Sequence, residues 1–142
     1  MYGRPISIPH FEGSPPLPSE VDDEYISDDS IACQPANRLS YMTGFVTITK
    51  LFRIFLQGTW MQHASHSIRP SIVGEESIRK FVVEALAELR DVKQSLPPLL
   101  QPGNQSGVGK NDIYATQAAN ICITALCLEL YLASSPHPDA PD

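Results

Sequence analysis

Three long segments carry apolar residues at helical spacing, and this feature constrains the fold more than any other. The segments are residues 39–66, 75–95 and 112–134, and prolines or glycines separate them. In the second segment, one face is apolar at Ile78, Phe81, Val82, Ala85, Leu86, Leu89 and Val92. No stretch alternates in the way that predicts a strand. The sequence therefore predicts an all-α fold with three long helices.

The first and third predicted helices are apolar around most of their circumference. The apolar residues of the first include Met42, Phe45, Val46, Leu51, Phe52, Phe55, Leu56 and Trp60. The third carries only two charged residues, Asp112 and Glu129, so we expect it to pack on several sides. Helices of this kind are usually buried inside something larger. The sequence thus predicts that the chain is part of a larger helical domain or needs a protein partner.

The two ends of the chain differ from this helical region. Residues 1–38 hold six prolines and seven of the 16 acidic residues, which predicts an extended acidic connection. Residues 39–134 form the predicted helical region. The last segment, 135–142, contains three prolines and is expected to be a disordered tail.

Charge and composition argue against several classes of function. The formal net charge is −6 and the ten basic residues are scattered, so this chain alone should not bind nucleic acid well. No run of about 18 apolar residues occurs, so we expect no membrane span. The absence of a signal-peptide pattern, together with the odd number of cysteines (Cys33, Cys122 and Cys127), predicts reduced thiols in an intracellular compartment.

No catalytic, metal or cofactor site is expected. The loop 101–111 is rich in glycine, but it lacks the first glycine and the Ser/Thr of a phosphate-binding loop, and no strand precedes it. His63 and His66 are three residues apart, and a zinc site would need further ligands that the neighbouring sequence does not supply. Cys122 and Cys127 are five apart and do not converge on a helix, so we expect them to be small buried residues. No G-x-S-x-G motif occurs, and we expect no enzyme.

The stretch Ser19–Tyr25, SEVDDEY, leaves several interpretations open. Three adjacent carboxylates cannot all face one substrate, and the spacing of a calcium-binding loop is absent. The wider stretch EVDDEYISDDSI mixes acids with apolar residues, as acidic activation segments do. A solvated turn is the remaining alternative.

The order of several motifs resembles the fungal-specific transcription factor domain, the helical middle region of zinc binuclear cluster regulators. The resemblance rests on Gly3-Arg4-Pro5, on Leu17-Pro18 followed by Asp22-Asp23-Glu24, and on a Glu88–Leu100 segment containing Leu96-Pro97-Pro98. Residues 119–124, ANICIT, match a further motif in part. The resemblance spans residues 2–134 and implies that the acidic run is a structural signature in a connecting segment, where it caps a helix or pairs with Arg4 or another base.

The resemblance further implies a regulatory region of a nuclear transcription regulator. Such regulators read DNA through a six-cysteine zinc cluster upstream, and this chain has three cysteines, none in C-x-x-C spacing. Zinc and DNA would therefore belong to a module outside this chain, which itself would hold no cofactor. The expected partners are other helices of the same domain or a protein, with a second copy of the chain as one option. The chain is expected to be an internal fragment of the domain; the alternatives are a stand-alone helical interaction module and a truncated, non-functional product.

Overall fold

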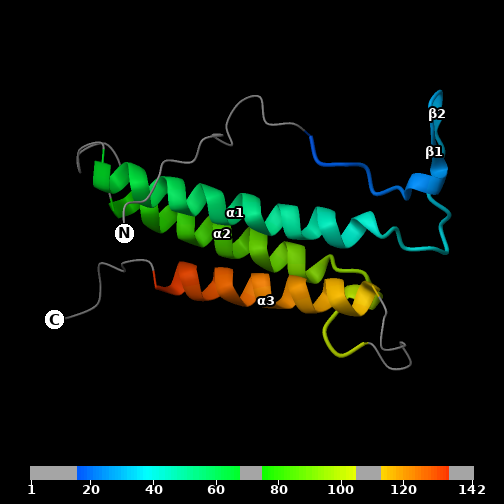
Figure 1. The fold of residues 1–142 in the computed structure, drawn as a ribbon. Helices are drawn as coiled ribbons and strands as arrows, with labels where there is room; N and C mark the ends of the chain where they lie inside the picture. Colours follow the sequence, from blue (N-terminus) through cyan, green and yellow to red (C-terminus); the bar gives the residue numbers. More distant parts are fainter. Residues whose placement is uncertain (1–15, 68–74, 105–112, 135–142) are drawn as a thin grey trace.

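The computed structural model describes residues 16–67, 75–104 and 113–134, without the side chains of 60–67 and 75. Three long helices dominate it: α1 (Met42–Ser67), α2 (Glu75–Gln94) and α3 (Ile113–Ala133). Figure 1 shows them side by side, with α1 and α3 running in the same direction and α2 in the opposite one. The prediction of a mainly helical chain with three long helices is confirmed. The first helix begins three residues later than predicted, and the others agree within one residue.

The core lies where the three helices meet. Each helix contributes side chains of which less than 8% of the surface is exposed, and the 3-10 turn η2 (Pro98–Leu100) closes one end with Leu100. The fully buried members are Leu51, Ile54, Leu89, Leu100, Ile121, Leu128 and Leu132. Their spacing on each helix follows the 3.6-residue period, which is why the sequence pattern located the helices.

Several apolar residues on the outer sides of the helices are exposed, although the sequence predicted that the apolar stripes are buried. Phe45 and Phe52 of α1 and Leu86 of α2 are exposed, although they lie in the predicted apolar stripes. Within the described residues α3 does not pack on several sides, and its burial by a larger domain or a partner stays a prediction. α3 contacts α1, α2 and η2 through its inner side, and only five of its 21 residues are buried. Three helices leave one side of every helix open, so an all-round apolar helix must expose part of its surface.

Residues 16–41 are not extended throughout. A short 3-10 turn, η1 (Asp23–Tyr25), leads into a hairpin of two-residue strands, β1 (Ile26–Ser27) and β2 (Ser30–Ile31), which pair antiparallel. The hairpin projects away from the bundle near the start of α1 (Figure 1). These strands were not predicted, because two residues are too few for an alternating pattern.

Gly58 lies where α1 meets both other helices. A Cβ atom at this position would be 2.9 Å from Cε1 of Tyr131 on α3 and 3.3 Å from Cε1 of Phe81 on α2. Gly58→Ala should gain about 1 kcal/mol of helix propensity but lose about 1–3 kcal/mol through overpacking. We therefore expect a net loss of about 1 kcal/mol in the free energy of unfolding, measured by urea titration. The exposed Gln57→Ala is the control, and stabilisation of the chain by Gly58→Ala would contradict this packing.

Candidate interaction site

Asp22 connects the N-terminal segment to the start of α1. Its residue surface is 6% exposed. The carboxylate accepts hydrogen bonds from the Ser40 hydroxyl (2.8 Å), the Tyr41 backbone N–H (2.7 Å) and the Gln34 side-chain amide (3.1 Å). The Ser40 hydroxyl in turn accepts a bond from the backbone N–H of Met42, the first residue of α1 (3.0 Å). Asp22 thus satisfies backbone and side-chain donors at a helix start, where such groups have no partner inside the helix.

The surroundings of Asp22 lower its pKa. Burial alone would raise it, because desolvation disfavours the charged carboxylate. The hydrogen bonds from Ser40, Gln34 and Tyr41 and the charge of Arg38 outweigh burial and place the pKa below its ordinary value of 3.8. Asp22 therefore stays ionised at neutral pH, and its oxygens are occupied by protein donors. This arrangement suits a structural role and leaves no free oxygen pair for acid–base chemistry.

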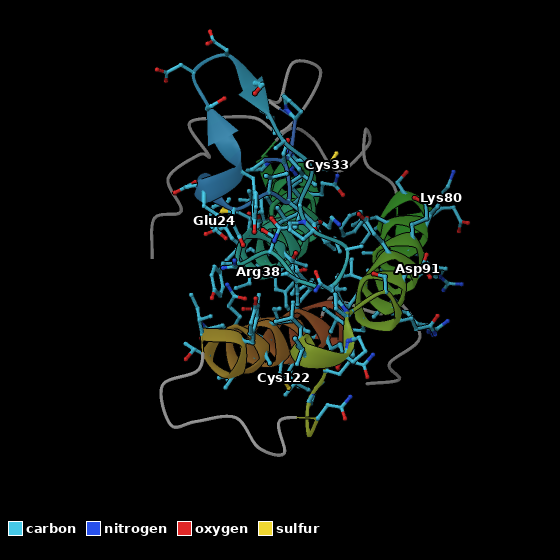
Figure 2. The ribbon with its side chains drawn as sticks, turned by 90° about the vertical axis from the view of Figure 1, so that its right-hand side faces the viewer. Glu24, Cys33, Arg38, Lys80, Asp91 and Cys122 are labelled. Atoms are coloured by element: carbon cyan, nitrogen blue, oxygen red, sulfur yellow. The ribbon has the colours of Figure 1, made fainter. Side chains whose placement is uncertain are left out.

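Arg38 is the base that the acidic run contacts within the described residues. Its Nε lies 3.9 Å from Oδ2 of Asp22, and its guanidinium also forms an ion pair with Glu24. The guanidinium carbon is 5.7 Å from the centre of the Tyr41 ring. Figure 2 shows Glu24 and Arg38 on the same side of the molecule, beside the start of α1. The expected pairing of the acidic run with a base is thus made by Arg38; Arg4, the other candidate, lies outside the described residues.

The start of α1 is also fixed to α3. The Tyr41 and Tyr114 rings stack with centroids 5.3 Å apart, and the Tyr114 hydroxyl donates to the Leu39 carbonyl (2.5 Å). The Gln117 amide donates to the Tyr41 carbonyl (2.7 Å). Gln117 lies so close to α1 that a Cβ atom on Gly44 would overlap its side chain. Sequence reasoning missed these contacts, because their partners are more than 70 residues apart.

The remaining signature residues have different environments. Asp23 and Glu24 are exposed in η1, and Leu17 is half-buried before Pro18. Leu96 is buried in the core, and Pro97 and Pro98 start η2. Residues 3–5, GRP, lie outside the described residues. The structure therefore brings Asp22 and Glu24 together at Arg38 and keeps the Leu96-Pro97-Pro98 motif in a separate place.

The described surface is hollowed in at least two places. One, of about 270 Å³, is lined by the polar group around the start of α1: Asp22, Asp23, Glu24, Arg38, Tyr41 and Met42. The other, of about 140 Å³, is lined mainly by apolar residues between the end of α2, η2 and α3, with Lys93 as its charged member. Lys93 is paired with Glu129 across α2 and α3, with 2.7 Å between Nζ and Oε1.

The outer side of α3 forms a continuous apolar stripe. We call it the α3 outer stripe; its members are Thr116, Ala119, Ile123, Leu126, Leu130 and Ala133, all exposed. The exposed fractions of Ile123, Leu126 and Leu130 are 60%, 50% and 71%. Successive members are 3, 4, 3, 4 and 3 residues apart, which is the seam spacing of helices that pack along their length. The stripe was not distinguished from the rest of α3 in the sequence, because the helix is apolar on both sides.

The cysteines correct one expectation. Cys127 is exposed and Cys122 is only half-buried, so neither is a buried core residue as predicted. Cys33 is exposed too. Among the residues that the structure describes, no three His, Cys, Asp or Glu side chains are grouped as metal ligands. The side chains of His63 and His66 lie outside that set.

One of the described helices, α3, is long and apolar enough to cross a membrane. This finding concerns length and composition alone, and core helices of soluble proteins pass the same test. The absence of a membrane span stays a prediction.

Comparison of the sequence with family models, and of the chain with curated proteins and solved structures, finds no match in any of the three.

Proposed function

We propose that this chain is a helical protein-interaction region and that the α3 outer stripe is the surface that another protein covers. The observation that carries the proposal is the exposure of three large aliphatic side chains, Ile123, Leu126 and Leu130, in one unbroken line. Contiguous exposed apolar surface of this kind marks interaction sites in soluble proteins.

The contacts at the start of α1 support this role by making the bundle rigid. The N-terminal segment is tied to α1 through Asp22, and α1 is tied to α3 through Tyr41, Tyr114 and Gln117. A helix that is fixed at one end and packed along its inner side presents its outer side in one geometry. Such pre-organisation lowers the entropy cost of binding.

The biological context that we propose is regulation of transcription. The order of the GRP, Leu17–Glu24 and Leu96–Pro98 motifs supports it through their resemblance to the fungal-specific transcription factor domain. In that context the region would restrain or respond to a zinc-cluster module outside this chain, in the nucleus. The covering protein would then be more of the same regulator or a protein bound to it.

Thiol protection tests the proposed surface. Cys127 adjoins the α3 outer stripe and Cys33 follows the hairpin, and both are exposed in the isolated chain. We expect the ratio of the Cys33 alkylation rate to the Cys127 alkylation rate to be higher in living cells that express the chain than in the dilute purified chain. In the dilute purified chain the two rates should be within about threefold, and mass spectrometry of the peptides measures both.

Two results have clear meanings. Slow labelling of Cys127 only in cells, or in concentrated protein, means that the stripe is covered and supports the proposal. Equal labelling of both thiols in cells and at every concentration overturns it. The variant Leu130→Glu serves as a control, because it should restore rapid labelling of Cys127 wherever a bound protein caused the protection.

A further inference from the structure

The α3 outer stripe is self-complementary when reversed. Its spacings, 3-4-3-4-3, read the same in both directions about a point between Thr124 and Ala125. Two copies of α3 packed antiparallel about that point would place Ile123 opposite Leu126 and the small Ala119 opposite the large Leu130. Small residues facing large ones let side chains interdigitate along a helix pair. A two-fold contact requires a surface to complement itself in this way.

We propose that the partner on the α3 outer stripe is a second copy of this chain, joined through an antiparallel α3–α3′ contact. The proposal rests on the proposed function, since it names the protein that covers the same surface. The pairing places Thr116, Ala119 and Ile123 of one copy beside Ala133, Leu130 and Leu126 of the other. The two-fold axis makes the two halves of the contact identical.

The charges around the stripe permit this contact. None of the six stripe residues is charged. The one ionisable carboxylate on α3 within the described residues is Glu129, and Lys93 of the same chain pairs with it at 2.7 Å. Facing α3 helices would therefore bring no unpaired like charges together, although each whole chain carries a net charge of −6. Like charges directly opposed would have excluded a two-fold contact.

The same charges disfavour a membrane surface as the occupant. Helices that lie on membranes carry Lys and Arg on their polar side, and α3 has neither in its 21 residues. A net charge of −6 is repelled by anionic lipids. The inner side of α3 is already used, with Ile121, Leu128 and Leu132 in the core of the bundle.

The area of the α3 outer stripe sets the expected affinity of the contact between two copies. A helix of 21 residues is about 31 Å long and about 10 Å wide, so its outer side is a strip of roughly 300 Å². A standard interface contributes about 800 Å² from each partner. The contact is thus expected to be weak and reversible, with a dissociation constant between about 10 µM and 1 mM.

Sedimentation equilibrium of the purified full chain, from about 5 µM to 1 mM, tests the proposal directly. We expect a monomer–dimer equilibrium for the natural chain. Leu130→Glu should weaken it at least tenfold, because a two-fold contact would bury two unpaired carboxylates. The matched control is Val83→Glu, which adds the same charge at a 62% exposed position on α2 and should leave the equilibrium within about threefold.

A mixing experiment tests the direction of the helices. Ala119→Lys and Leu130→Glu should each weaken self-association, and an equal mixture of the two variants should recover a dimer. In the antiparallel contact, Lys at 119 of one copy faces Glu at 130 of the other. In a parallel contact each position faces itself, so the Lys at 119 would face Ala119, the Glu at 130 would face Leu130, and both charges would stay unpaired. Recovery that falls well short of the affinity of the natural chain would overturn the proposed register.

Failure of this inference is distinguishable from failure of the proposed function. A natural chain that stays monomeric to 1 mM overturns the second copy as partner. If Cys127 is nevertheless protected in cells, a different protein covers the stripe and the proposed function stands. Protection confined to the membrane fraction, lost on extraction with carbonate, would assign the stripe to lipid and overturn both.

Discussion

Replacing Leu128 by alanine should lower the free energy of unfolding by about 2–5 kcal/mol, whereas Leu130→Ala should change it by less than about 0.5 kcal/mol. The two leucines are two residues apart on α3 and the chemistry of the substitution is identical. They differ in environment: Leu128 is 2% exposed in the core and Leu130 is 71% exposed. Alanine at 128 removes packed side-chain atoms and leaves a cavity, while alanine at 130 removes atoms that water already surrounds. Urea titration of the dilute chain measures both values.

Measurements at high protein concentration further distinguish the role of Leu128 in the core from the role of Leu130 in the α3 outer stripe. At several hundred micromolar, self-association through the α3 outer stripe adds to the stability of the natural chain. Leu130→Ala should remove that added stability, and Leu128→Ala should retain it as far as the variant remains folded. Equal losses for both variants in dilute solution would mean that α3 is packed on both sides in a single chain, contrary to the arrangement in Figure 1.

The helices were predictable from sequence because their inner residues repeat at the helical period over five or more turns. In α2 the polar residues mark the outer side clearly, so both its bounds and its core side were identified. In α3 the pattern predicted the helix but did not show which of its sides faces the core. Ile121 and Ile123 look equivalent in sequence, yet one is buried and the other is 60% exposed, because only the positions of α1 and α2 decide which side is inside.

The contacts at the start of α1 were less predictable. Adjacent acids such as Asp22 and Asp23 are chemically alike, and the sequence does not say which is buried. The partners of Asp22 lie 12 to 19 residues further along the chain, beyond the reach of local patterns. Ser40 was the available local signal, because a serine just before an apolar helical stretch is a common N-cap. It would have moved the predicted start of the first helix from residue 39 towards Met42.

Asp22→Ala should lower the midpoint of thermal unfolding at pH 7 by about 5 °C or more. The substitution leaves the Ser40 hydroxyl, the Tyr41 N–H and the Gln34 amide without the acceptor that they share. Those donors hold the N-terminal segment on α1 and, through Tyr41, contribute to the contact with α3. Calorimetry measures the midpoint. Asp23→Ala is the matched control, because Asp23 is the exposed neighbour, and it should change the midpoint by less than about 2 °C.

The pH dependence of Asp22→Asn tests the carboxylate itself. Folding lowers the pKa of Asp22 below its ordinary 3.8, so the folded chain binds the proton less readily than the unfolded one. The stabilisation from the charged form is therefore complete above about pH 5 and is lost as the pH falls from about 4 through the folded-state pKa. The difference in stability between the natural chain and Asp22→Asn should be constant from pH 7 to 5 and shrink below pH 4. Comparing the two chains cancels the titration of the other 15 acidic residues, which are common to both. A difference that persists unchanged to pH 2.5 would show that Asp22 acts through its shape and neutral hydrogen bonds, and that its charge contributes nothing to holding the N-terminal segment in place.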